Sequence, residues 1–277
     1  MVRIVSDTST LYSTAQAREA GFAVSPLAVT IAGESYRELD EMTAEKFVEI
    51  INQGHMPASS QPAIGEVMDL YEEYAGEEII NIAMADGLSG TYQSAVAAAE
   101  GAQNITVVNT TTLCGPHRYM VETAAKLAKE GKSKQEILAA LDQMMATDVS
   151  YLMPADFDYL RRGGRLSPLV SLVGKTIKLA PVLTQSEDGR QLVMSAVKRS
   201  YKQALAHIAQ KLAEHGVGKG WRIYITHAVH EQRMLEAKAV MEAAFPEATI
   251  ECYTLTPAFI TQGGPSCVAV QVVKEIG

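Results

Sequence analysis

Short apolar runs alternate with stretches of helical periodicity along the whole chain, and this alternation restricts the fold more than any other feature. Apolar runs of four to eight residues are typical of buried strands, and apolar residues spaced three and four apart are typical of helices that cover a sheet. The alternation therefore predicts an α/β fold. Strands are expected at residues 2–6, 22–29, 79–84, 105–108, 151–153, 182–185, 192–197, 222–226, 250–254 and 268–273.

The two halves of the chain differ in their strand pattern. The first half reads as regular βαβ units, which favours a parallel sheet. Some strands of the second half alternate polar and apolar residues, as residues 249–253 do, and this indicates a mixed sheet. Because the pattern changes near residues 147–158, we expect an N-terminal α/β domain over residues 1–155 and a C-terminal α/β domain over residues 156–277.

Composition excludes several classes of protein. The 277 residues carry a net charge of −8, which argues against a general nucleic-acid or membrane-surface binder. No apolar run approaches the roughly 18 residues that span a bilayer, and the N-terminus lacks the apolar core of a signal peptide. The three cysteines have no metal-like spacing, so no metal site is expected. These features predict a reduced, cytoplasmic protein without stable membrane insertion.

Two segments place small hydroxyl residues just before expected helices. In the first, Ser59-Ser60-Gln61-Pro62-Ala63, the proline suits a first helical position, so Ser60 or Gln61 is the expected cap. In the second, Ser89 and Gly90 follow the strand at 79–84 and precede an alanine-rich helix at 94–100. A strand, a turn and a helix start gather unpaired N–H groups that favour an anion. The alternative is that the serines only cap their helices.

A third segment, residues 159–167, sets two glycines between arginines. Such a turn allows close backbone approach, and a guanidinium on it suits a carboxylate or a phosphate. For Arg161 and Arg162 a solvated surface turn is the preferred interpretation.

Catalytic alternatives have weaker support. Gly87-Leu88-Ser89-Gly90-Thr91 resembles the G-x-S-x-G turn of serine hydrolases, but Thr91 stands in place of the second glycine. His227 follows in the order that such an enzyme requires, yet no acid partner is identifiable, and a structural role for this histidine is preferred. No phosphate-binding loop of a nucleotide site is present in the sequence, and no cofactor is expected.

Five segments in series resemble the DegV family of bacterial fatty-acid-binding proteins. Residues 59–63 are similar to that family's T-S-Q-P-S, and residues 88–95 match its L-S-G-T-Y-Q-S-A. Residues 156–167 are similar to its D-x-L-x-x-L-x-x-G-G-R-I-S, with Asp158 where an apolar residue is usual. Residues 4–9 and 178–190 fit as well. These segments keep the family's order from one end of the chain to the other.

The resemblance implies a two-domain DegV-like fold with a long-chain fatty acid buried between the domains. It also implies a carrier without catalytic residues, which presents the fatty acid to the separate ATP-binding subunit of a fatty acid kinase for phospholipid synthesis. Carried over by position, the ligand-binding residues are Ser59, Ser60, Ser89, Gly90, Arg165 and Gln262. Lys198 or Arg199 is the expected contact with the kinase. Aliphatic residues after Ser167, such as Leu169, Val170 and Leu172, are expected to line the tail tunnel.

The sequence departs from the family pattern at three positions. Gln262 replaces a histidine, Asn109 replaces an aspartate, and Ala63 lacks the hydroxyl of a serine. These changes bear on the head-group contacts and on the kinase partnership. A carrier or sensor of another carboxylic lipid, without a kinase partner, therefore remains the alternative, ahead of a serine hydrolase.

Overall fold

The computed structural model describes residues 1–167 and 179–276. The described residues group into two compact units. The first comprises Met1–Ala146 together with Thr256–Ala258, and the second comprises the other described residues from Thr147 onwards. The division between Ala146 and Thr147 lies upstream of the boundary expected after residue 155, and it assigns β8 (Val149–Met153) to the second unit.

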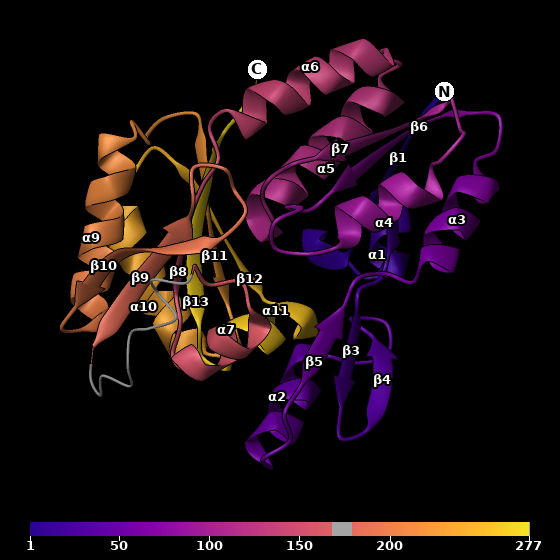
Figure 1. Ribbon diagram of the computed structural model, residues 1–277. Coiled ribbons are helices and arrows are strands. Elements are labelled where there is room, and N and C mark those ends of the chain that lie inside the picture. The colour runs from indigo at the N-terminus through magenta and orange to yellow at the C-terminus, as the bar shows by residue number, and fades with distance from the viewer. Residues whose placement is uncertain (168–178, 277) are drawn as a thin grey trace. The chain divides into compact units, whose positions relative to one another are not determined.

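A parallel sheet forms the centre of the first unit. Its strand order is β2 (Ala23–Ser25), β1 (Val2–Asp7), β6 (Glu78–Ala83) and β7 (Ile105–Asn109). Apolar residues of α3 (Ile64–Glu73) and α4 (Thr91–Ala98) pack on one face, and α5 (Cys114–Lys129) covers the other. Figure 1 shows this layering, with α6 (Lys134–Met145) beside α5. The predicted parallel sheet is confirmed.

A small antiparallel sheet follows in the same unit, with the order β4 (Glu34–Arg37), β3 (Ala28–Ile31) and β5 (Ala58–Ser60). The single strand predicted at residues 22–29 is wrong, because β2 and β3 belong to different sheets. Pro26 lies between them, and a proline donates no N–H to a ladder and fixes its own φ angle. The chain therefore leaves one sheet at this proline and enters the other, before α2 (Ala44–Asn52).

A mixed sheet forms the centre of the second unit. Its strand order is β10 (Leu192–Lys198), β9 (Ala180–Gln185), β8, β13 (Val268–Lys274), β11 (Trp221–His227) and β12 (Thr249–Thr254). The pair β11 and β12 is parallel, and the other recorded pairs are antiparallel. Figure 1 shows α9 (Tyr201–Glu214) and α10 (Glu231–Ala244) against this sheet, where their apolar residues join its core. The predicted α/β fold class is confirmed.

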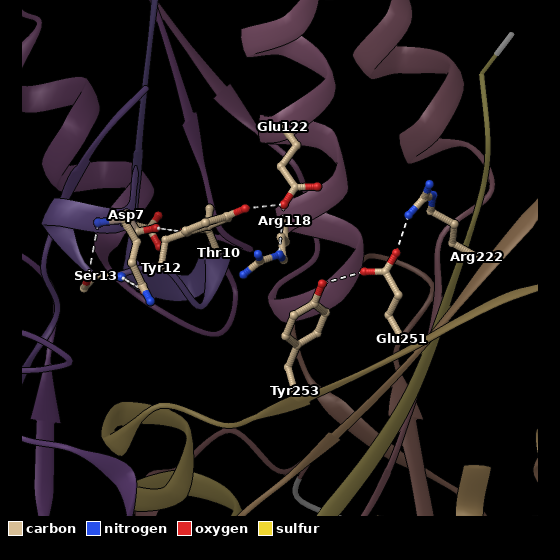
Figure 2. A network of polar contacts seen from close by, with 10 residues as sticks. Asp7, Thr10, Tyr12, Ser13, Arg118, Glu122, Arg222, Glu251 and Tyr253 are labelled. Atoms are coloured by element: carbon tan, nitrogen blue, oxygen red, sulfur yellow. Dashed lines mark hydrogen bonds and ion pairs between the residues drawn. The ribbon is translucent and has the colours of Figure 1, made fainter. Parts of the chain in front are cut away.

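Charged side chains form contacts between strands at one edge of the mixed sheet. Glu251 on β12 accepts hydrogen bonds from Arg222 on β11 and, at 2.5 Å, from the Tyr253 hydroxyl, as Figure 2 shows. Arg222 also pairs with Glu275 at 3.0 Å, just beyond β13. Partly exposed pairs of this kind contribute about 0–1 kcal/mol each.

In the part of the chain that the structure describes, no helix has the length and apolarity needed to cross a bilayer.

Side chains cap several helix starts of the first unit, but not the start of α3. Ser133 and Glu136 form a reciprocal capping box at α6, and Thr43 caps α2. The expected cap at Ser60 or Gln61 is wrong, because Ser60 lies in β5, paired with β3, and α3 begins only at Ile64. Ala63 is the residue at the cap position, and it offers no side-chain hydrogen bond.

Restoring a hydroxyl at this cap is expected to stabilise the protein. Ala63 has φ −61° and ψ 132°, an extended backbone that suits a cap residue. The variant Ala63→Ser is expected to raise the free energy of unfolding by about 0.5–2 kcal/mol, measured by urea denaturation. The control Ala75→Ser, on an exposed turn, is expected to change it by less than about 0.5 kcal/mol. Equal effects of the two substitutions would contradict the capping interpretation.

Candidate functional site

The turn that leaves β6 is held from both sides by side-chain oxygens. Asp7, at the end of β1, accepts the Met84 N–H at 3.2 Å and the Ser9 N–H at 2.8 Å. Asn109, at the end of β7, accepts the Asp86 N–H at 3.3 Å. The turn therefore starts from a fixed stem at the carboxyl ends of parallel strands, where open α/β sheets bind their ligands.

His117 on α5 contacts residues at the same ends of the parallel strands. Its Nε2 lies 3.0 Å from the Ser6 hydroxyl, and its Nδ1 lies 3.0 Å from the Thr110 hydroxyl. The Ser6 hydroxyl also donates to the Ile82 carbonyl at 2.6 Å, and the Thr110 hydroxyl donates to the Ala83 carbonyl at 3.0 Å, so each ring nitrogen contacts a hydroxyl that is bonded to a strand end. Burial lowers the pKa of His117, and the nearby Asp7 opposes this effect. Through these two contacts His117 positions the strand ends.

The chain that follows Asp7 is fixed against α5 by a second set of polar contacts. Figure 2 shows the Tyr12 hydroxyl donating to Glu122 at 2.6 Å, while Arg118 pairs with the same carboxylate at 2.9 Å. The Arg118 guanidinium lies 3.7 Å from the centre of the Tyr12 ring, a cation–π distance. This cluster positions the segment after η1 (Thr8–Thr10).

Ser89 and Gly90 lie at the start of α4 with donors that can face a ligand. The Ser89 oxygen accepts the Thr91 N–H at 3.3 Å and lies 2.8 Å from the Thr91 hydroxyl. With the Thr91 hydroxyl as donor, the Ser89 proton remains available for an acceptor outside the turn. Within the described residues, the N–H of Gly90 donates no hydrogen bond. The N-terminal end of α4 adds a positive partial charge at this point.

A glutamine joins the two hydroxyl-bearing segments. A Cβ atom added at Gly90 would lie 2.1 Å from Oε1 of Gln61, so the Gln61 amide lies directly on the Gly90 backbone. Ser59 is two residues before Gln61, the spacing that puts side chains on one face of extended chain, whereas Ser60 points to the other face. Ser59 is half-buried and Ser60 is exposed. The strand geometry therefore favours Ser59 over Ser60 as a neighbour of the Ser89 turn.

The second unit contains a similar contact between a glutamine and a glycine. A Cβ atom added at Gly163, the last residue of α7 (Phe157–Gly163), would lie 2.0 Å from Oε1 of Gln262 on α11 (Pro257–Gly263). Arg165 donates to the Gly163 carbonyl oxygen. A Cβ atom at Gly264 would lie 2.8 Å from the Tyr159 ring. The two expected residues of this unit, Arg165 and Gln262, are thus brought together around one turn.

Other expected residues take structural positions. Arg161 and Arg162 are exposed, and Arg161 pairs with Asp158 at 3.0 Å, as the surface interpretation predicts. The Nδ1 of His227 accepts the His230 N–H at 3.0 Å, which is the structural role expected for it. The apolar residues expected to line a tail tunnel after Ser167 lie outside the described residues.

The hydrolase arrangement is not formed at Ser89 within the described residues. The hydroxyl of Ser89 is paired with Thr91, and the buried His117 is paired with Ser6 and Thr110. Residues 1–167 and 179–276 contain no group of three or more His, Cys, Asp or Glu side chains placed to hold a metal ion. The arrangement offers hydroxyl and N–H donors, which suit an anion.

Sequence reasoning missed three residues that build this site. Gln61 was considered only as a cap, although its place in the T-S-Q-P-S-like segment was a signal. Asp7 lies in the segment 4–9, whose resemblance to the family assigns it no role, and a lone histidine on a helix, such as His117, gives no indication of its partners.

Comparisons with known proteins cover nearly the whole chain. The sequence model of the family described as "Uncharacterised protein, DegV family" matches residues 1–275. A DegV domain-containing protein of Listeria monocytogenes is 30% identical over 272 residues, which is 95% of each chain. The structure of DegV from Bacillus subtilis, described as a fatty acid binding protein, aligns with a TM-score of 0.87 and 27% identity over 99% of both chains. A DegV family protein of Thermus thermophilus, described by its fatty acid binding, aligns with a TM-score of 0.88 and 25% identity over 99% of both chains.

The contact between Gln61 and Gly90 can be tested directly. The variant Gly90→Ala is expected to displace the Gln61 amide, because the new methyl group would occupy its place, and to cost less than about 1.5 kcal/mol, because the long side chain can move. The side-chain NH₂ resonances of Gln61, followed by NMR, should shift in this variant. Gly65→Ala, with no atom within 4 Å of the added methyl group, is the matched control and should leave them unchanged. Unshifted Gln61 resonances in Gly90→Ala would contradict the contact.

Proposed function

Because the chain belongs to the DegV family, we propose that it binds a long-chain fatty acid, with the carboxylate at the Ser89–Gly90 turn. The observation that carries the proposal is the contact of Gln61 with Gly90, which joins two segments rich in hydroxyl donors. The two solved relatives described above as fatty-acid binders support it. We propose Ser59 and Ser89 as the hydroxyl donors and Gly90 as the N–H donor.

In this proposal, hydrogen bonds to the carboxylate and burial of the tail contribute differently to the binding free energy. A hydrogen bond to a charged group contributes about 1.5–3 kcal/mol. Burying about 16 methylenes at ~0.8 kcal/mol each contributes roughly 12 kcal/mol before the costs of ordering. The tail therefore supplies most of the affinity, and the donors fix the position of the carboxylate.

Two residues of the second unit are proposed as further polar ligand groups. Arg165 offers a guanidinium, and Gln262 offers an amide in place of the family's histidine. Both lie around the Gly163 turn of their own unit. Ser60 has no part in the proposal, because it is exposed and points away from the face that carries Ser59.

We further propose that the chain is a cytoplasmic carrier that performs no chemistry itself and presents the fatty acid to a separate ATP-binding kinase subunit. Lys198, the last residue of β10, or the adjacent Arg199 is the proposed contact with that subunit. Neither forms an ion pair with another described residue, although the protein as a whole is acidic. Two adjacent basic residues without ion-pair partners suit an acidic surface on a partner protein.

The fatty-acid proposal is tested by extraction and by titration. Protein purified from bacteria is expected to yield about one fatty acid per chain by mass spectrometry. In delipidated protein, Ser89→Ala is expected to weaken fatty-acid binding about tenfold to a hundredfold, because one charge-assisted hydrogen bond is lost. Calorimetric titration measures the affinity.

Ser133→Ala is the matched control, since it removes a serine hydroxyl from another helix start and should lower stability without changing affinity. Protein that yields no fatty acid and binds none afterwards would contradict the proposal. Unchanged affinity in a folded Ser89→Ala protein would remove Ser89 from the site.

The carrier proposal has its own test. The chain alone should form no acyl phosphate from ATP, and adding an ATP-binding kinase subunit should start the reaction. The double variant Lys198→Glu, Arg199→Glu is expected to slow that reaction about tenfold or more while leaving fatty-acid affinity unchanged. Lys129→Glu, an exposed lysine on α5, is the control. Acyl phosphate produced by the chain alone would contradict the carrier role.

A further inference from the structure

Glu38 is a fully buried carboxyl group at the end of β4 in the first unit. Its Oε1 accepts a hydrogen bond from the Thr8 hydroxyl, and its Oε2 accepts the Ala258 N–H at 2.8 Å. Thr8 is oriented for this role because its own oxygen accepts the Leu27 N–H at 3.0 Å. Glu38 therefore links the small antiparallel sheet to a segment that lies 220 positions later in the sequence.

The segment that Glu38 binds is a short stretch that groups with a different unit from its neighbours in the sequence. Thr256, Pro257 and Ala258 group with the first unit, whereas the residues on both sides of them belong to the second. Pro257 and Ala258 are also the first two residues of α11, the helix that carries Gln262. The contact with Glu38 thus fixes the start of that helix.

Burial and hydrogen bonding act on Glu38 in opposite directions. Burial is the largest effect and raises its pKa, while the donors Thr8, Ala258 and Thr256 lower it, and the result is a pKa of about 7. Asp7, on β1, is the charged group that faces it, and it adds to the increase. His117 in turn faces Asp7, and the charged residues of the same turn, Arg37, Asp40 and Glu41, are exposed.

We propose that Glu38 is a pH-sensitive anchor, which holds Thr256–Ala258 and the start of α11 on the first unit and weakens as the pH rises through neutrality. The geometry carries this assignment, because the segment covers the carboxyl group that binds it. Detachment would expose Glu38 to water.

The sign of the effect follows from the two states of the anchor. Glu38 binds its proton more tightly when it is covered, with a pKa of about 7, than when it is exposed, with the ordinary value of 4.5. Protons therefore favour the anchored state, and this stabilisation is complete below about pH 4.5 and is lost as the pH rises through about 7. Between pH 6 and pH 8 the anchoring equilibrium should fall about tenfold.

NMR of the whole protein tests the anchor at its own contact. The amide resonance of Ala258 is expected to titrate with a midpoint near pH 7, because its N–H is bonded to the titrating group. Hydrogen exchange at Thr256 and Ala258, corrected for the intrinsic pH dependence, should become up to about tenfold faster from pH 6 to pH 8. Glu38→Gln keeps the shape and cannot titrate, so both effects should disappear in it.

Glu41→Gln is the matched control, because it changes a glutamate on the same turn that is exposed, and it should behave as the native protein does. An Ala258 resonance that stays constant from pH 5.5 to 8.5, or that titrates equally in Glu38→Gln, would overturn the proposal. The native titration decides the matter by itself if Glu38→Gln does not fold.

A consequence for binding rests on the proposed function. If the anchoring is coupled to binding, fatty-acid affinity should fall by up to about tenfold from pH 6 to pH 8 in the native protein and stay level in Glu38→Gln. An affinity that is independent of pH would limit the anchor to a structural role. Absence of binding at both pH values would contradict the proposed function, while the Ala258 titration would still decide on the anchor.

Discussion

A parallel sheet ends in backbone N–H groups that the strands themselves cannot satisfy, and in the first unit side-chain oxygens accept them. Asp7 and Asn109 accept the N–H groups of Met84 and Asp86, so the turn that carries Ser89 leaves β6 from a fixed stem. Burial makes such hydrogen bonds difficult to lose, because an unsatisfied N–H costs about 1–3 kcal/mol. The position of the donors at α4 therefore depends on two residues that contact no proposed ligand. The replacement of the family's aspartate by Asn109 keeps this acceptor and removes its charge.

Periodicity predicted most strands of the two larger sheets, because a buried strand face is apolar, but it did not predict β4 or β5 of the small antiparallel sheet. The strand ranges at 79–84, 222–226 and 268–273 lie within one residue of β6, β11 and β13, and the alternation at 249–253 indicated the mixed sheet. Positions in the candidate site were reached only through motif resemblance. Hydroxyl residues before helices occur wherever helices are capped, so the residues by themselves did not distinguish a cap from a ligand group.

The remaining features depend on contacts between distant segments, which local patterns do not encode. Glu38 lies in a polar stretch that reads as a surface turn, and only the return of Ala258 to the first unit buries it. Gln61 has a glycine as its neighbour, and no spacing rule connects residues 61 and 90. The strand expected at 22–29 failed for a local reason that was visible, since Pro26 interrupts it.

The carboxylate site proposed for the first unit lies in an acidic protein, and two features limit the negative charge near it. Backbone N–H groups surround Asp7, so its charge is offset where it stands. Glu38 lies beside Asp7 in a fully buried position, where two adjacent carboxylates would repel each other. Holding a proton on Glu38 removes that repulsion, and in the proposed anchor the same proton favours the state in which Glu38 is covered. If the carboxylate of the ligand approaches the same strand ends, its charge favours the protonated form of Glu38 further. Ligand binding and anchoring would then reinforce each other through a shared proton.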